Sequence, residues 1–318
     1  MSTFESPKAA AAALVFLILY LFYTIAAVNI IRLKGCRSRY SFLTLYGVIR
    51  FGGQLCGVVF AALGLAHWQW LIAYLVLGAE GYFVLVLFTF HYLIQAQKKY
   101  FGWSWLRPTK EEKAKLKSQK HSFFLKRLAG YISIFEIFHL LLIPANVCII
   151  YGGTSTAGKT TQEIADDPSI ITKSRILRTV GQALFLGETL FIVVMAMYVY
   201  FVEQIKNLVH LTAIFMVSPF LTIRGIFGIL SIYISSMNYY DSSNYTALGL
   251  SSQFVTYEYV LGTTMEFISG AILIFGFYWH RRREAAESDP QDCQINIEDS
   301  TEKGIHHKST EVQTQEWN

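Results

Sequence analysis

The chain has 318 residues, of which 53% are hydrophobic and only 15% charged, and its net charge is +5. Soluble domains carry about 25% charged residues, so this chain lacks the polar groups that keep the surface of a soluble protein hydrated. Its positive residues cluster beside long apolar segments, where they anchor loops at anionic lipid. The net charge therefore does not indicate a nucleic-acid partner.

The apolar residues fall in seven segments, each long enough for the roughly 20 residues that cross a bilayer as a helix. The first has no charge before Arg32 and is too long for a signal peptide, so we expect it to be a retained span. The pattern predicts an all-α fold, a seven-transmembrane helix bundle in contact with the lipid bilayer. The predicted spans are Ala9–Leu33, Ser41–Trp68, Gln69–Ala96, Leu128–Tyr151, Ser174–Val202, Leu208–Met237 and Gln253–His280.

Lysine and arginine predict the orientation, because basic loops remain in the cytosol. The first and third loops and the end of the last span are basic, whereas the second and sixth loops contain no lysine or arginine. We therefore expect a lumenal or extracellular N-terminus and a cytosolic C-terminus. Lys173, Arg175 and Arg178, at the lumenal start of the fifth span, break the rule and are interpreted as interfacial side chains.

Two further features bear on the organisation of the chain. The sequon Asn244-Tyr245-Thr246 lies in the sixth loop and predicts N-glycosylation of Asn244, hence a glycoprotein with this loop in the lumen. Residues 1–283 form the predicted membrane domain, and residues 284–318 form a polar cytosolic tail whose composition indicates disorder.

One motif points to a different class of protein. Residues Gly153–Thr160 match G-x-x-x-x-G-K-[ST], the phosphate-binding loop of nucleotide hydrolases. Such a loop needs a strand before it and a helix after it, but this one follows an apolar helix and precedes "ADDPS". We therefore expect a flexible loop and no bound nucleotide.

Inserting an ionisable side chain into the centre of a bilayer costs about 2.5–3.5 kcal/mol, so each such residue is a candidate functional residue. Glu80, Glu188 and Glu266 lie deepest in their spans and are the candidate catalytic acids. The candidate binding residues are Arg50, Arg224 and one stripe of the fourth span, formed by Glu136, His139 and Asn146.

A purely structural interpretation stands beside this one. Arg50 and Arg224 could pair with Glu80, Glu188 or Glu266 and fix helix packing without chemistry. Most aromatic residues are explained by belts at the membrane interfaces. The tryptophans assigned to these belts are Trp68, Trp70, Trp103, Trp105 and Trp279.

Three segments carry a resemblance to a known family: "RSRYSFLTLYGVIRFGGQLCGVVFAALG", "SPFLTIRGIFGILSIY" and "TTMEFISGAILIFGFYW". With Arg50 and its following glycines, Pro219, Arg224 and Glu266, the chain resembles fungal seven-transmembrane proteins that share a domain of unassigned function. The resemblance implies the fold, a fungal source and membrane residence, but no chemistry. In architecture alone, the chain is similar to fungal membrane-embedded terpene cyclases.

We favour the first of three functions and keep the other two as alternatives. An intramembrane cyclase or isomerase of fungal secondary metabolism would use a buried carboxylic acid to protonate an apolar, prenylated or terpenoid substrate. A receptor or sensor would have a cavity open to the lumen, and the third possibility is a lipid or metabolite transporter. No lysine lies in the last span, which excludes a retinal Schiff base. We expect no metal or cofactor, and residence in the endoplasmic reticulum or the plasma membrane.

Overall fold

The computed structural model describes residues 6–118, 124–155, 167, 169–204, 209–246 and 249–283. The chain divides into two units, Met1–Ile274 and Phe275–Asn318. The first unit holds the helices discussed below, except for the end of the last helix. Of the second unit, the structure describes residues 275–283, the end of the last helix, and the predicted polar tail lies outside the described residues.

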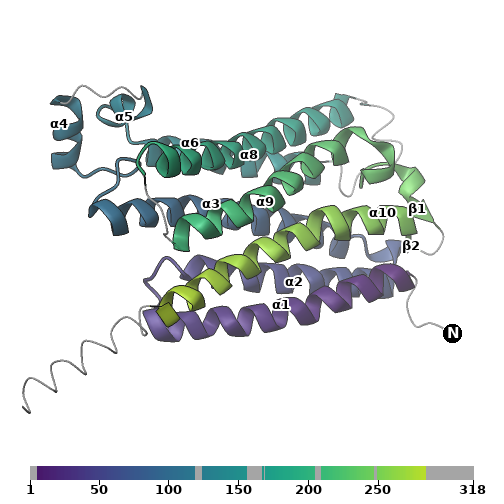
Figure 1. Cartoon of the computed structure of the whole chain (residues 1–318). Coiled ribbons are helices and arrows are strands. Elements are labelled where there is room, and N and C mark those ends of the chain that lie inside the picture. The colour runs from purple at the N-terminus through teal and green to yellow at the C-terminus, as the bar shows by residue number, and fades with distance from the viewer. Residues whose placement is uncertain are drawn as a thin grey trace, which may run out of the picture. The chain divides into compact units, whose positions relative to one another are not determined.

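Seven helices within the described ranges are long and apolar enough to cross a bilayer (Figure 1). The predicted all-α bundle is thereby confirmed, and the chain has the character of a multi-pass membrane protein. The last helix begins with α10 (Ser252–Tyr257) and the π-helical segment η4 (Glu258–Thr263). The seven helices are α1 (Pro7–Lys34), α2 (Ser41–Leu63), α3 (Gln69–Phe101), α6 (Ile134–Thr154), α8 (Ser169–Phe201), α9 (Val209–Tyr233) and Ser252–Arg283.

Four helix boundaries differ from the prediction by five or six residues: α3 ends five residues later and α8 begins five residues earlier than predicted, whereas α2 and α6 are shorter. α2 ends at Leu63 because Gly64 takes a positive φ of 69°, and the short helix η1 (Leu65–His67) follows. α6 begins at Ile134, six residues after the predicted start, because the chain turns after α5 (Phe124–Ala129). Apolar composition does not reveal where α2 ends or where α6 begins, because the residues on both sides of each of these two boundaries are hydrophobic.

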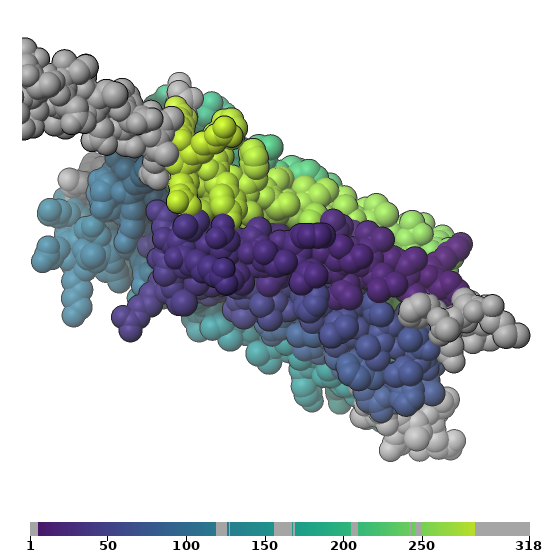
Figure 2. Space-filling model, turned by 90° about the horizontal axis from the view of Figure 1, so that it is seen from below, coloured from purple at the N-terminus to yellow at the C-terminus, as the bar shows by residue number. Residues whose placement is uncertain are grey.

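The helices pack in chain order, with α3 at the centre. α1 packs on α2, α2 on α3, α6 on α8 and α8 on α9, while α3 also contacts α6, α8 and α9. α3 is buried almost continuously from Val84 to Ile94. α1 lies along the outside of the first unit (Figure 2), and its Phe22 and Ile25 side chains are 66% and 59% exposed, as expected of a surface that faces lipid tails.

The third loop folds back onto the end of α8. It contains α4 (Lys110–Ser118) and α5, and Trp105 before them is only 2% exposed. The Trp105 indole Nε1 donates to Glu203 Oε1 at 2.8 Å, and Lys126 Nζ lies 2.6 Å from the same oxygen. The assignment of Trp105 to an interfacial belt was therefore wrong, because Glu203 draws the indole into a buried polar contact.

The loop between α9 and the last helix is compact. It contains η2 (Ser235–Met237), η3 (Ser242–Asn244) and the two-residue strands β1 (Tyr245–Thr246) and β2 (Gly249–Leu250). The strands pair antiparallel, with Tyr245 opposite Leu250. This loop lies at the end of the bundle where α3 and α10 begin, and it forms one wall of the cavity described next (Figure 1).

Candidate functional site: an arginine-lined cavity

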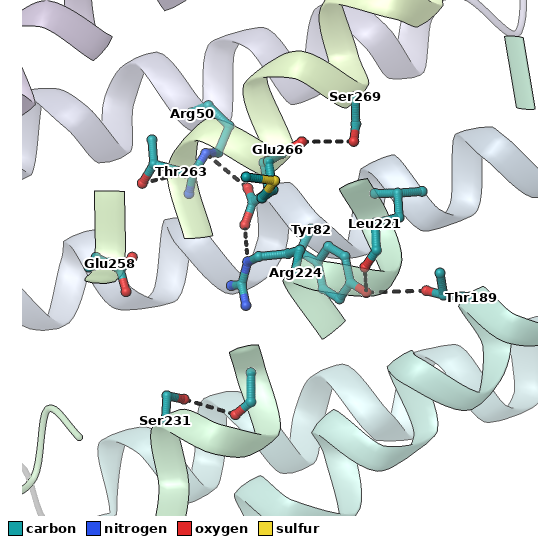
Figure 3. Close-up of polar contacts among 12 residues, drawn as sticks. Arg50, Tyr82, Thr189, Leu221, Arg224, Ser231, Glu258, Thr263, Glu266 and Ser269 are labelled. Atoms are coloured by element: carbon teal, nitrogen blue, oxygen red, sulfur yellow. Dashed lines mark hydrogen bonds and ion pairs between the residues drawn. The ribbon is translucent and has the colours of Figure 1, made fainter. Parts of the chain in front are cut away.

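Three charged side chains from three helices meet inside the first unit. Arg50 of α2 and Arg224 of α9 both contact Glu266 of the last helix, at 3.2 Å between Arg50 Nε and Glu266 Oε2 and at 2.5 Å between Arg224 Nε and Glu266 Oε1. Glu266 is 1% exposed and Arg50 is 3% exposed. Figure 3 shows the carboxylate lying between the two arginines. We call this cluster the ion triplet.

The ion triplet confirms that the two arginines pair with a carboxylate and identifies which one. Both oxygens of Glu266 face guanidinium groups, although the contact with Arg50 lacks the geometry of a hydrogen bond. Arg50 Nε also donates to the Tyr20 hydroxyl at 3.4 Å, and its Nη2 donates to Thr263 Oγ1 at 3.4 Å. Two guanidinium groups share one carboxylate, so the triplet holds one positive charge in excess.

Glycines on α3 make room for Arg50. A Cβ atom at Gly81 would overlap with Arg50 Cδ, and one at Gly78 would lie 3.3 Å from Arg50 Nη1. One turn from Gly78, the ring of Tyr82 lies 5.0 Å from Arg224 Cζ, a distance at which the ring face stabilises the cation. α3 therefore accommodates one arginine by the absence of side chains and supports the other with an aromatic ring.

The π-helical segment η4 ends three residues before Glu266 in the last helix. It runs from Glu258 to Thr263, and Thr264 Oγ1 donates to the Tyr259 carbonyl five residues earlier at 2.6 Å. A π-helical turn holds an extra residue per turn and is frequent at functional sites. Here it presents both Thr263, which contacts Arg50, and Glu258, which accepts from the Tyr74 hydroxyl at 3.3 Å.

A cavity of about 120 Å³ lies beside the ion triplet, toward the loop between α9 and α10. We call it the arginine cavity, because Arg50, Arg178 and Arg224 line it together with the carboxyl group of Glu258. The terminal nitrogens of Arg224 point away from Glu266 (Figure 3). With Glu266 beside it, the cavity has three guanidinium groups against two carboxyl groups.

The loop between α9 and α10 covers the Arg178 side of the cavity. Arg178 Cζ lies 3.8 Å from the centre of the Tyr240 ring, and the Tyr240 hydroxyl donates to the Gly153 carbonyl at 2.6 Å. Burial raises the pKa of the Tyr240 phenol, and the adjacent Arg178 guanidinium opposes that rise. Arg178 is 9% exposed, and no carboxylate among the described residues lies within ion-pairing distance of it.

The interpretation of Arg178 as an interfacial side chain was wrong. Lys173 and Arg175 are exposed as expected, but Arg178 turns inward because it lies on the same face of α8 as the buried Ser174. Gln182, one turn further along, also lines the cavity, and its Oε1 atom is buried without a hydrogen-bond donor among the described residues. The spacing of Ser174, Arg178 and Gln182 at four-residue intervals was the signal in the sequence.

The other two candidate acids lie outside the ion triplet. Glu80 is partly buried and accepts a hydrogen bond from Asn146 Nδ2 at 2.7 Å, which joins α3 to α6. Glu188 on α8 is 6% exposed, and neither of its carboxyl oxygens has a hydrogen-bond partner among the described residues. Neither these two acids nor Asn146 lines the arginine cavity.

The three residues of the predicted stripe in the fourth span lie in three different environments. Glu136 lies in the first turn of α6 and is exposed, where its charge suits the positive end of the helix dipole. His139 lies among aromatic rings, 5.5 Å from the ring of His91, and its Nδ1 atom is 2.8 Å from the Phe135 carbonyl. Of the stripe, only Asn146 contacts another candidate residue.

The sequon folds in a way that disfavours a glycan. Asn244 is 5% exposed, and its Nδ2 atom, to which a glycan would be attached, donates to the carbonyl oxygens of Ser235 at 2.5 Å and Asn238 at 2.9 Å. The described part of the phosphate-loop motif, residues 153–155, does not have the structure of a phosphate-binding loop. Gly153 belongs to the end of α6 and not to a loop after a strand, and residues 156–166 lie outside the described residues.

The chain matches no protein-family model, no curated protein and no solved structure. The geometry of the site therefore carries the functional argument. In the part of the chain that the structure describes, no group of three His, Cys, Asp or Glu side chains is placed to hold a metal ion. The three cysteines within these ranges, Cys36, Cys56 and Cys148, are free thiols.

Proposed function

We propose that this protein is a membrane receptor or sensor that binds a small ligand in the arginine cavity. The observation that carries the proposal is the cavity itself, in which charged and aromatic side chains from five helices and from the loop between α9 and α10 converge beside the ion triplet. Ligand sites are concave and combine apolar walls with a few polar groups that orient the ligand. The orientation that the basic loops predict would place the cavity on the side of the lumen or the cell exterior.

A binding site fits the geometry better than a transport path. From Val84 to Ile94, α3 is buried almost continuously between the ion triplet and the opposite end of the bundle. α6 and α9 also continue as helices through Pro144 and Pro219. Transporter sites are typically formed by helices that break at the binding site.

The ligand test compares two substitutions on adjacent residues of α9. Ser231 lines the cavity, so Ser231→Phe fills it, while Leu230 is 37% exposed on the outer face, so Leu230→Phe adds the same bulk away from the site. Each purified protein is incubated with a small-molecule extract, washed, and analysed by mass spectrometry for retained compounds. We expect a compound retained by the wild type and by Leu230→Phe but not by Ser231→Phe. Equal retention by all three proteins, or none by the wild type, contradicts the proposal.

Glu188 favours a second candidate, the intramembrane cyclase. It is the buried carboxyl group with no bonding partner among the described residues, and it lies on the same face of α8 as the buried Phe185 and Ile192. A cyclase needs an acid of this kind that is free to protonate an apolar substrate. Glu266 suits that role less well, because both of its oxygens face arginines.

The cyclase candidate has its own test. Metabolites are compared between hosts that carry the wild-type protein and Glu188→Gln. Replacement of one product by a compound of identical mass and different retention time supports a cyclase. An unchanged profile with normal protein abundance removes Glu188 from that role.

A further inference from the structure

We infer that the arginine cavity selects a small oxyanion, a carboxylate or phosphate group held between Arg178 and Arg224. The inference rests on the proposed binding function and adds the chemical class of the ligand. Guanidinium groups offer paired N–H donors that match the oxygens of both anions.

The charge around the cavity favours an anion. Glu266 offsets one of the two arginines in the ion triplet, and Glu258 is the other carboxyl group beside the cavity. Arg178 adds a third guanidinium group, and it stacks on Tyr240 instead of pairing with a carboxylate among the described residues. A buried cation without a counter-ion is unfavourable, so an entering anion gains more here than a neutral ligand does.

The arrangement of the donors fits an anion bound at one place. Arg178 and Gln182 lie one turn apart on α8, and Arg224 and Gly228 lie one turn apart on α9. Gln182 packs directly against Gly228, which brings the two turns together. Arg178 thus approaches from the side of the loop between α9 and α10, where it stacks on Tyr240. Arg224 approaches from the ion triplet, with its terminal nitrogens turned away from Glu266 (Figure 3).

The volume limits the ligand. A cavity of about 120 Å³ is close to the roughly 150 Å³ that accommodates a benzene-sized molecule in an engineered protein cavity. The oxyanion is therefore a small molecule or the end group of a larger one, such as a lipid headgroup. Both share the same recognition chemistry, so the experiment must separate the two sources.

The test measures thermal unfolding of the full chain in nanodiscs of phosphatidylcholine, titrated with phosphate, sulfate, acetate or succinate at constant ionic strength. We expect at least one anion to raise the unfolding temperature saturably, by about 5 °C at a concentration a hundred times its Kd. Arg178→Gln should abolish the shift. Arg175→Gln, an exposed charge on the same helix, should retain it.

A second set of nanodiscs identifies the source of the anion. If phosphatidic acid raises the unfolding temperature of the wild type but not of Arg178→Gln, and the soluble anions do not, the oxyanion is a lipid headgroup. If no anion in either form gives a shift that depends on Arg178, the inference is overturned. The proposed binding function survives that result if a neutral or cationic compound is still retained by the wild type and lost in Ser231→Phe.

Discussion

Glu266 is shared between Arg50 and Arg224, with 3.2 Å from Oε2 to Arg50 Nε and 2.5 Å from Oε1 to Arg224 Nε. This sharing makes the three residues unequal. Removal of Glu266 leaves both guanidinium groups with no counter-ion in the triplet, whereas removal of Arg224 leaves one balanced pair.

Glu266→Gln should therefore destabilise the protein more than Arg224→Gln does. Breaking a buried ion pair by removing one partner costs about 3–5 kcal/mol, and we expect Glu266→Gln to reach that range. Arg224→Gln should cost less, because Arg50 and Glu266 still pair. Reversible unfolding in detergent, followed by circular dichroism, measures both values. The reverse order would show that the two arginines do not share Glu266.

Gly81→Ala should displace Arg50 from the ion triplet. The added Cβ overlaps with Arg50 Cδ, so either the side chain or the helix must move, at a cost of about 1–3 kcal/mol. Gly187→Ala is the matched control, because no atom lies within 4 Å of the Cβ position and alanine favours the helix by up to about 1 kcal/mol. Unfolding of the two variants should shift in opposite directions, and a shared direction contradicts the packing described for Arg50.

Asn244 should carry no glycan. Its Nδ2 atom donates two backbone hydrogen bonds that hold the loop between α9 and α10. Thr246→Ala destroys the sequon and leaves Asn244 in place, so we expect it to run at the wild-type position on a gel, with or without glycosidase. Asn244→Ala should instead destabilise the loop, by about 1–3 kcal/mol for the loss of buried hydrogen bonds. A glycosidase-sensitive band in the wild type that Thr246→Ala lacks would contradict this loop structure.

Glu203→Gln should release the third loop. Glu203 Oε1 receives both the Trp105 indole and the Lys126 ammonium group, and these contacts hold the loop at the end of α8. Without the charge, trypsin should cut within Lys110–Ser118 several-fold faster, because local opening exposes the backbone. Glu111→Gln, an exposed change on α4, should leave the rate unchanged. Equal rates in both variants would show that Glu203 does not hold the loop.

The loop between α9 and α10 should loosen at high pH. Burial raises the pKa of the Tyr239 phenol well above its usual value and also raises the pKa of Tyr245. A raised folded-state pKa stabilises the fold below the unfolded pKa of about 10, and the contribution is lost as the pH rises through the folded value. Limited proteolysis between pH 9 and 12 measures the opening. Tyr245→Phe should shift the profile, whereas Tyr151→Phe, 64% exposed, should not.

The seven helices could be predicted because lipid demands long apolar segments, which are visible in the sequence. The pairing inside the bundle could not be predicted. Arg50 and Arg224 had three possible partners in Glu80, Glu188 and Glu266, and the choice depends on how far each helix is rotated about its axis. Sequence spacing shows which residues share a helical face but not which neighbouring helix that face meets.

Arg178 and Trp105 show the same limit at the ends of the helices. Both residue types are common at membrane interfaces, so each was predicted to lie there. Tyr240 and Glu203 draw them inward instead, and both partners come from segments distant in the sequence. Residues near a helix end are therefore assigned less securely than those at its centre.

The reactivity of a cysteine placed in the arginine cavity reports both the accessibility and the charge of that cavity. Ser231→Cys is prepared in a background in which Cys36, Cys56, Cys148 and Cys293 are replaced by serine. Its rates with an anionic and a cationic methanethiosulfonate reagent are each divided by the rate with a free thiol in solution. Because the cavity concentrates anions, we predict that the anionic reagent is favoured about tenfold or more at low salt. No reaction in the folded protein, or preference for the cationic reagent, would contradict an accessible cavity that binds anions.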